Sequence, residues 1–403
     1  MKKTVFTQIE GGNGFYGLLA ALGAVILIGL WAWFHMEHSG HYVTGMTNQI
    51  VWGMPHVFAI FLIVAASGAL NVASIGSVFG KKFYKPLAPL SGLLAITLLL
   101  GGLTVLVLDL GRPDRLIVAM THFNPKSIFT WNILLYNGFL GLVVVYLWTM
   151  MEKRMNCYTP VAGFFAFIWR LILTTGTGSI FGFLVARQGY DAAIMAPMFI
   201  VMSFSFGLAC FMLVLMATYK WTDRPLGDVV VNRLSKLLGI FIAGALYFVL
   251  VQHLTNLYAT EHHGVEAFIL RDGGTYTSLF WFGFVVLGSL APMALIFFPQ
   301  TAKNRTAITL ASALVVLGGF ALVYVIVIGG QAYPLQLFPG YEVVSSFEGA
   351  TGSDFYGYNP SSWEIMLGFM GVAMTLAITT VAFKALRFLP ESLGDDMVDP
   401  HAK

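Results

Sequence analysis

Residues 52–80 read WGMPHVFAIFLIVAASGALNVASIGSVFG and contain no Lys, Arg, Asp or Glu. A transmembrane helix needs about 20 consecutive, predominantly apolar residues. This stretch is longer than a membrane crossing requires, so it predicts a spanning helix that is tilted or whose end projects into water.

Nine further apolar segments appear when the sequence is cut at polar and turn-rich breaks. Runs such as Phe241–Leu250 and Ala311–Val327 do not alternate between apolar and polar residues, as the strands of a membrane β-barrel would. The first segment is long and no small-residue cleavage site follows it, which predicts a retained span rather than a signal peptide. The sequence therefore predicts an all-α integral membrane protein, one polytopic domain over 1–403, with about ten transmembrane helices near 15–34, 50–79, 86–109, 128–150, 161–185, 194–219, 236–258, 276–298, 306–329 and 364–387.

The overall composition agrees with a membrane location and excludes several other classes. Of 403 residues, 58% are hydrophobic and only 10% are charged, against roughly 25% charged in soluble proteins. The two cysteines, Cys157 and Cys210, are too few for a disulfide framework, an iron–sulfur cluster or a Cys-based zinc site. A redox centre held by cysteine must therefore belong to a partner. The net charge of +3 averages over two membrane faces and gives no indication of nucleic-acid binding.

The basic residues divide unevenly between the two sides of the predicted membrane. Sixteen Lys and Arg lie on the side of both termini, five lie on the other side, and Arg170 lies inside the fifth segment. By the positive-inside rule, both termini are expected in the cytoplasm of a bacterial or archaeal cell, with the protein in its cytoplasmic (inner) membrane.

A weak internal repeat relates the second and sixth segments at an offset of about 140 residues. Both open with a proline, continue through a small-residue stretch and end at basic residues. The repeat predicts two parallel four-helix bundles, 50–185 and 194–329, with the first and tenth segments added outside. The connection 331–363 has no Lys or Arg and is expected to form an outer loop, as a docking surface or as a lid over the bundle.

The densest polar cluster is Leu108-Asp109-Leu110-Gly111-Arg112-Pro113-Asp114-Arg115, at the outer end of the third segment. Proline restricts the residue before it and ends a helix, which places Asp109 in the last turn with Arg112 able to pair with it. The cluster is either a helix-terminating ion pair or a carboxylate whose pKa is set by the arginine, suited to proton exchange with a lipid-soluble redox ligand.

The predicted topology gathers more polar and aromatic residues at the same outer end. A quinone head group needs a hydrogen-bonding group for each carbonyl oxygen, an aromatic wall and a proton-exchanging acid or imidazole. Asp109 and His56 are the candidate proton-exchanging pair. The other candidates are Arg112, His122, Asn132 and Tyr136 for quinone binding, with His253 in the corresponding place of the second bundle.

Arg170 is a cation well inside the fifth predicted span. An ionisable residue there faces protein or water, and the hydroxyls that follow it could support a water wire. The candidate proton path is Arg170, Thr174, Thr177 and His253. The competing interpretation is an arginine that extends toward the cytoplasmic side, with threonines that pack helices.

Three stretches carry a resemblance to a known family: LDLGRPDR at 108–115, HFNPKSIFTWN at 122–132, and the 52–80 stretch quoted above. They resemble the NrfD/PsrC-like quinone-interacting membrane subunits. The ten segments and the motif SGALNVASIG at 67–76 most resemble the DsrP branch of this family. DsrP is the membrane subunit of the DsrMKJOP complex of sulfur metabolism. The resemblance covers nearly the whole sequence and is sharpest over 50–137.

The resemblance implies a subunit of an oxidoreductase complex that is not catalytic alone and holds no haem or iron–sulfur cluster. It would exchange electrons between menaquinone or ubiquinone and a ferredoxin-like, DsrO-like iron–sulfur subunit on the outer face. A multihaem cytochrome c and further Dsr-type subunits are implied as well. The acidic or histidine position before Gly-Arg-Pro falls on Asp109, and a histidine of some relatives is replaced by Asn71, a weak substitute.

Three other functions stay open at this stage. A haem-binding electron carrier would need axial histidines on facing helices, and eight of the nine histidines lie in outer loops or at outer helix ends instead. A secondary transporter would place its site near the midplane, commonly in inverted repeats. A purely structural anchor would contain no quinone site.

Overall fold

The structure is a computed structural model that describes residues 4–334 and 357–398. It contains ten helices long and apolar enough to cross a membrane, so the predicted all-α membrane fold and its ten spans are confirmed. In order, the spans are α1 (Asn13–Ser39), α2 with α3 (Met54–Ala69, Asn71–Ser77), η2 with α4 (Lys82–Leu87, Ala88–Leu108), α6 (Ile128–Met151), η4 with α7 (Lys153–Tyr158, Thr159–Gly182), α8 (Met195–Trp221), α9 (Asp228–Tyr258), α11 with η7 and α12 (Thr275–Ser278, Leu279–Leu290, Ala291–Phe297), α13 with η8 and α14 (Arg305–Tyr324, Val325–Gly329, Gly330–Ala332), and α15 (Ser362–Ala385).

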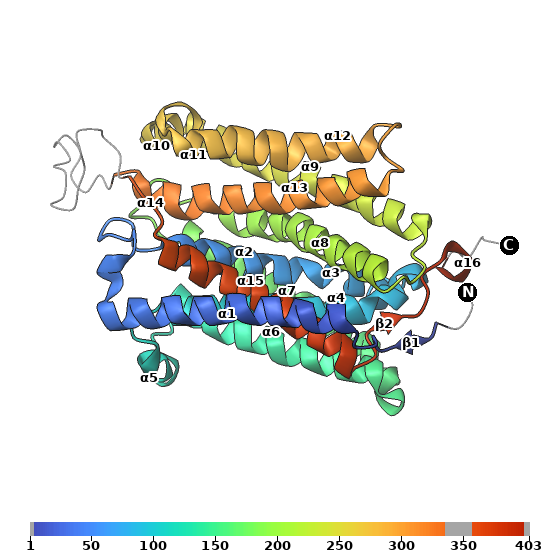
Figure 1. Cartoon of the computed structure of the whole chain (residues 1–403). Helices are drawn as coiled ribbons and strands as arrows, with labels where there is room; N and C mark the ends of the chain where they lie inside the picture. Colours follow the sequence, from blue (N-terminus) through green and yellow to red (C-terminus); the bar gives the residue numbers. More distant parts are fainter. Residues whose placement is uncertain (1–3, 335–356, 399–403) are drawn as a thin grey trace.

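Short elements lie at the two ends of the helix bundle: β1 (Phe6–Thr7), η1 (His41–Val43), η3 (Pro113–Arg115), α5 (Leu116–Thr121), η5 (Thr260–His262), α10 (His263–Ala267), η6 (Phe268–Asp272), β2 (Leu389–Pro390) and α16 (Asp395–Val398). β1 and β2 pair antiparallel, Phe6 with Pro390 and Thr7 with Leu389. We call the end with β1, β2 and α16 the terminal face and the end with α5 and α10 the opposite face (Figure 1).

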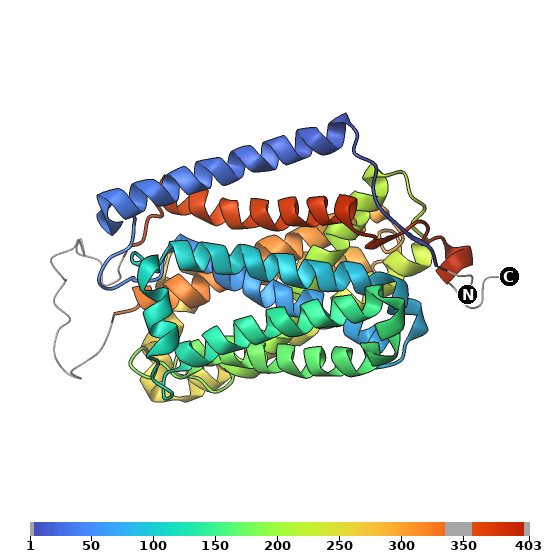
Figure 2. The same ribbon diagram turned by 90° about the horizontal axis from the view of Figure 1, so that it is seen from below.

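The helix α2 forms the centre of the molecule. Its span is 94% buried, and it packs against α4, α7, α8, α13 and α15. In contrast, α1 packs chiefly on α15 and lies at the edge of the bundle, as Figure 2 shows. Neighbouring spans 2–5 and 6–9 also pack within each group, and the groups meet along α2 and α8. Their division into two parallel bundles stays a prediction.

The second span is broken at Leu70, between α2 and α3. Ser91 of α4 bridges the break, because its hydroxyl donates to the carbonyl of Ala69 at 2.6 Å and accepts the N–H of Ala73 at 3.0 Å. A buried backbone group without a partner is costly, so Ser91 stabilises an interruption in the middle of an otherwise apolar helix.

The predicted outer loop 331–363 is described only at its two ends. Gln331 lies in the last turn of the ninth span, where its side-chain oxygen accepts the N–H groups of Val51 and Trp52 at 2.9 and 3.0 Å. The central residues 335–356 lie outside the described part of the protein, so the loop stays a prediction.

Candidate functional site

His56 and Asp109 meet at the opposite face. His56 lies in the first turn of α2, Asp109 follows the last residue of α4, and His56 Nδ1 is 2.8 Å from Asp109 Oδ2. The Asp109 side chain is 1% exposed and that of His56 is 15% exposed. The structure therefore brings the two candidate proton-exchanging residues into contact, with the acid inside and the imidazole toward the surface.

The turn after α4 explains the position of Asp109. Its backbone N–H still bonds to the carbonyl of Val105 at 3.0 Å, but Gly111 then takes a φ of +65°, which side chains with a Cβ rarely adopt. A Cβ at Gly111 would also lie 3.2 Å from His41 Nε2. The backbone thus reverses directly after Asp109, with the His41 imidazole packed on the turn.

The Asp109 carboxylate has unused capacity to accept hydrogen bonds. Among the described residues, neither of its oxygens has a hydrogen-bond partner, and His56 Nδ1 is close enough for an ion pair but has no hydrogen-bond partner either. Buried polar groups are nearly always hydrogen-bonded. The site therefore fits a donor supplied from outside the protein, such as a hydroxyl group or water.

Arg112 does not pair with Asp109, contrary to the interpretation drawn from the sequence. Its guanidinium donates to Asp114 at 3.2 and 3.3 Å, with both side chains more than 60% exposed. This neighbour holds the pKa of the Asp114 carboxyl below its usual range through a hydrogen bond. Because residues 110–112 turn away from α4, the arginine points to the surface instead of back to the helix end.

An aromatic wall that the sequence did not single out stands beside His56. The Trp52 ring stacks 6.1 Å from the His56 ring and lies 5.9 to 6.3 Å from those of Phe129, Phe181 and Tyr190. Phe129 is on α6, Phe181 is on α7, and Tyr190 is in the connection between α7 and α8. A Trp-Gly-Met-Pro entry to a helix was visible in the sequence, but its convergence with Phe181 depends on the tertiary fold.

Asn132 and Tyr136 lie on one face of α6 and contact α7. Asn132 donates to the carbonyl of Gly176 at 3.0 Å, and the Tyr136 hydroxyl lies 3.5 Å from Thr177 Oγ1. Asn132 is 2% exposed and its side-chain oxygen has no partner among the described residues. The quinone-binding candidates Asn132 and Tyr136 are therefore close to Thr177, a proton-path candidate. Asn132 Oδ1 can still accept a hydrogen bond.

Asn71 belongs to a different cluster from Asp109. Its side-chain oxygen accepts a hydrogen bond from Arg170 Nη2 at 2.5 Å, and 15 positions separate it from His56 in the sequence, about 20 Å along a helix. Asn71 is thus not placed at the candidate quinone site. Arg170 is 1% exposed, so the alternative of an arginine extending to the cytoplasmic side is also wrong.

Thr174 completes this second cluster, because its hydroxyl lies 2.6 Å from that of Ser67 on α2. Arg170, Thr174 and Thr177 share one buried face of α7.

His122 follows α5 on an exposed segment, where its ring contacts the Thr121 hydroxyl at 3.0 Å.

His253 forms a second buried acid–imidazole pair, in the other group of spans. Its Nδ1 lies 2.6 Å from Oε2 of Glu266, and Asn256 donates to Oε1 of the same carboxylate at 2.8 Å. Glu266 is fully buried. Glu266 was not singled out from the sequence, because its polar loop resembles any interfacial loop until α10 folds back on α9.

A third buried carboxylate, Glu364, has a structural explanation. It accepts the Tyr358 hydroxyl at 2.5 Å and the N–H groups of Gly45 and Ser361 at 2.7 and 2.8 Å. Ser361 and Glu364 form a capping box at the start of α15. The Ser-x-x-Glu spacing is the signal that could have identified it.

Ten candidate spans, with a buried carboxylate in contact with an imidazole at one end of the bundle, define a polytopic membrane protein. The model of the family "Polysulphide reductase, NrfD" matches residues 42–334, and the protein belongs to that family. The resemblance noted from the sequence is confirmed at this level.

The protein covers nine tenths or more of the length of each of three relatives. It is 28% identical to an Hdr-like menaquinol oxidoreductase integral membrane subunit from Archaeoglobus fulgidus, over 98% of its own length and 99% of the relative. It is 23% identical to a subunit of selenate reductase from Mesobacillus selenatarsenatis, over 89% and 92%. It is 25% identical to one of the polypeptides of polysulfide reductase from Wolinella succinogenes, over 71% and 96%. The homologues are membrane subunits of oxidoreductase complexes.

Proposed function

We propose that this protein is the quinone-interacting membrane subunit of a respiratory redox complex, with its quinone site at the opposite face. The main support is the buried Asp109 carboxylate. It lies 2.8 Å from the His56 imidazole and accepts no hydrogen bond from any of the described residues. A quinol hydroxyl is a donor of the kind this carboxylate lacks.

Oxidation of a quinol to a quinone releases two protons and two electrons, which must leave by different routes. In the proposed reaction, Asp109 accepts a proton from a quinol hydroxyl, and His56 passes it toward water because it is the more exposed partner. The pair returns to its starting charge before it takes the second proton. Quinone reduction is the same sequence in reverse.

The electrons pass to a partner in this proposal, because two cysteines cannot hold an iron–sulfur cluster. We propose a ferredoxin-like, DsrO-like iron–sulfur subunit docked on the opposite face, within a complex that also contains a multihaem cytochrome c and other Dsr-type subunits. The excess of basic residues on the terminal side supports a cytoplasmic location for both termini. The opposite face is then the outer face of the cytoplasmic membrane.

The side chains around the pair favour a flat aromatic head group. Trp52 stacks beside His56 and supplies an apolar wall, while Asn132 keeps a free oxygen between α6 and α7, among the described residues. Among the relatives, one is named as a menaquinol oxidoreductase subunit, which supports menaquinone as the substrate. A proton path through Arg170, Thr174, Thr177 and His253 remains a prediction: the first three share α7, while His253 contacts Glu266 elsewhere.

Quinol oxidation by the purified complex tests the proposal. We expect Asp109→Asn to lower the rate of menaquinol-analogue oxidation by a factor of about 100 or more, since proton acceptance typically contributes that much. The matched control is Asp114→Asn, which removes an exposed carboxylate five positions away. Full activity of Asp109→Asn in an intact complex would overturn the assignment.

A further inference from the structure

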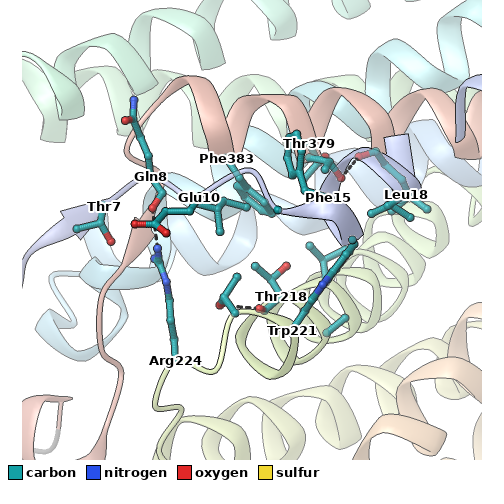
Figure 3. Close-up of a pocket in the computed structure, with 18 of the residues that line it drawn as sticks. Thr7, Gln8, Glu10, Phe15, Leu18, Thr218, Trp221, Arg224, Thr379 and Phe383 are labelled. Carbon is teal, nitrogen blue, oxygen red and sulfur yellow. Dashed lines mark hydrogen bonds between the residues drawn. The ribbon is translucent and has the colours of Figure 1, made fainter. Parts of the chain in front are cut away.

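A cavity of about 670 Å³ lies at the terminal face, at the other end of the bundle from the His56–Asp109 pair. Figure 3 shows the residues that line it. Three helices and the segment before α1 form its walls. Apolar residues of these helices line it, among them Phe15 and Leu18 of α1, Val214 of α8, and Leu376 and Phe383 of α15. Its volume is in the range of small-molecule sites, roughly 300 to 1,000 Å³.

The cavity fits within one leaflet of a bilayer. Its lining residues on α8 extend from Val214 to Trp221, which is about 10 Å at 1.5 Å per residue. One leaflet contributes about half of the roughly 30 Å hydrocarbon core. A spanning helix of a partner would need a groove through the full thickness, so the depth favours a lipid of the leaflet at the terminal face.

The position of α1 lets a lipid enter from the side. This helix packs mainly on α15, and its span is only 17% buried. Gly14 of α1 lies close to the Trp221 side chain of α8 at the end of the cavity, and the cavity separates α1 from α8 beyond that point. Trp221, 52% exposed at the end of α8, marks the level of the membrane interface.

Charged side chains gather where a lipid head group would lie. Glu10, Glu391 and Arg224 line the cavity, and Figure 3 shows Glu10 and Arg224 on the side away from Leu18. Arg224 is held in place by donating to the carbonyls of Gln8 at 2.8 Å and Pro390 at 3.3 Å. The two carboxylates match an ammonium group, and the guanidinium matches a phosphate.

We propose that this cavity binds one phospholipid with an ammonium-bearing, zwitterionic head group. An acyl chain lies among Phe15, Val214 and Leu376, the phosphate lies by Arg224, and the ammonium lies by Glu10 and Glu391. The bound lipid fills the space between α1 and the rest of the bundle. This inference does not depend on the quinone site.

Native mass spectrometry of the full-length protein tests it, after exchange into micelles with equal amounts of phosphatidylethanolamine and phosphatidylglycerol of the same acyl chains. We expect one retained phosphatidylethanolamine per protein molecule. Ala217→Trp, which places a ring in the cavity wall, should reduce this occupancy at least tenfold. Leu317→Trp is the control. Leu317 is 67% exposed and does not line the cavity, so this substitution should leave the lipid occupancy unchanged.

A double substitution tests which head group the cavity prefers. Glu10→Gln with Glu391→Gln should keep a bound phospholipid but remove the preference for phosphatidylethanolamine, whereas Glu37→Gln at the opposite face should keep it. A photoactivatable phosphatidylethanolamine should also cross-link the unmodified protein within residues 7–18 or 214–224. Retention of no phospholipid, equal retention of both lipids, or an isoprenoid quinone in their place would overturn the proposal.

Discussion

His253 and Glu266 repeat the contact that His56 makes with Asp109, since imidazole and carboxylate atoms are 2.6 Å apart in one pair and 2.8 Å in the other. The two pairs differ in one respect. Both oxygens of Glu266 have partners, His253 and Asn256, whereas neither oxygen of Asp109 has a hydrogen bond within the described residues. The Asp109 carboxylate can therefore still accept a hydrogen bond, as the proposed quinol site requires, whereas the Glu266 carboxylate is engaged by two side chains of α9.

This difference predicts opposite effects of removing the two carboxylates. Glu266→Leu should destabilise the protein by about 3 kcal/mol, because it leaves the buried His253 and Asn256 without their acceptor. Asp109→Leu should cost less stability and abolish quinol oxidation. Unfolding by denaturant and oxidation of a menaquinol analogue, measured on both variants, separate the two effects. A stable Glu266→Leu variant would contradict a structural role for the second pair.

The pairing of Arg112 with Asp114 gives a prediction about the pH dependence of quinol oxidation. Because its guanidinium pairs with exposed Asp114 and not with Asp109, Arg112→Gln should leave the pH dependence of quinol oxidation unchanged. If Arg112 instead acted on Asp109, its removal would move the acidic limb of the pH–rate profile to higher pH. The profile of the wild-type complex and of Arg112→Gln, recorded at the same ionic strength, distinguishes these results.

The sequence predicted the elements well and the contacts between them unevenly. Long apolar segments identified ten spans, because the length of a spanning helix is set by the membrane and is read locally. Asp109 and His56 were paired correctly since both lie at span ends on one side. Arg112 was assigned wrongly because the positive φ of Gly111 turns the backbone, and the Asn71–Arg170 contact depends on how α2 and α7 pack, which no local pattern contains.

Tyr358 gives a prediction about alkaline stability. Burial, with the nearby Glu364 charge, raises the pKa of its hydroxyl above the usual value. The folded state then keeps a proton that the unfolded state loses above about pH 10, so stability conferred by Tyr358 is present at neutral pH and falls as the pH rises past that value. Tyr358→Phe should cost about 1 to 3 kcal/mol at neutral pH and should lessen the alkaline decrease.

The measurement is the melting temperature of each protein at about pH 8 and about pH 10.5, on either side of the ordinary tyrosine pKa. Tyr42→Phe is a suitable control, because Tyr42 is 84% exposed. If Tyr358→Phe and the wild type lose the same stability between the two pH values, the Tyr358–Glu364 contact does not contribute to the alkaline decrease.

Asn71 and Arg170 should be energetically coupled. Asn71→Leu removes the side-chain oxygen that accepts from Arg170 Nη2 and leaves a buried charge, which should cost about 3 kcal/mol or more. Arg170→Met removes the charge itself, so adding Asn71→Leu to it should cost much less. A double-mutant cycle from denaturant unfolding measures the coupling. Additive effects of the two substitutions would mean that the contact carries no net energy.

The tight contact between α2 and α8 gives the last prediction. A Cβ at Gly68 would collide with the backbone carbonyl oxygen of Ser203, and one at Gly207 would collide with the backbone of Ala69. Backbone atoms in the centre of the bundle cannot move aside as a flexible side chain can, so Gly68→Ala must push the two helices apart. Overpacking of this kind costs about 1 to 3 kcal/mol or more, and α2 also carries His56, so quinol oxidation should fall with stability. Gly23→Ala is the matched control, because a Cβ there meets nothing within 4 Å, and replacing a helical glycine by alanine stabilises a helix by about 1 kcal/mol. Denaturant unfolding of the two variants should therefore give shifts of opposite sign, and a neutral Gly68→Ala would mean that α2 and α8 are farther apart than this packing requires.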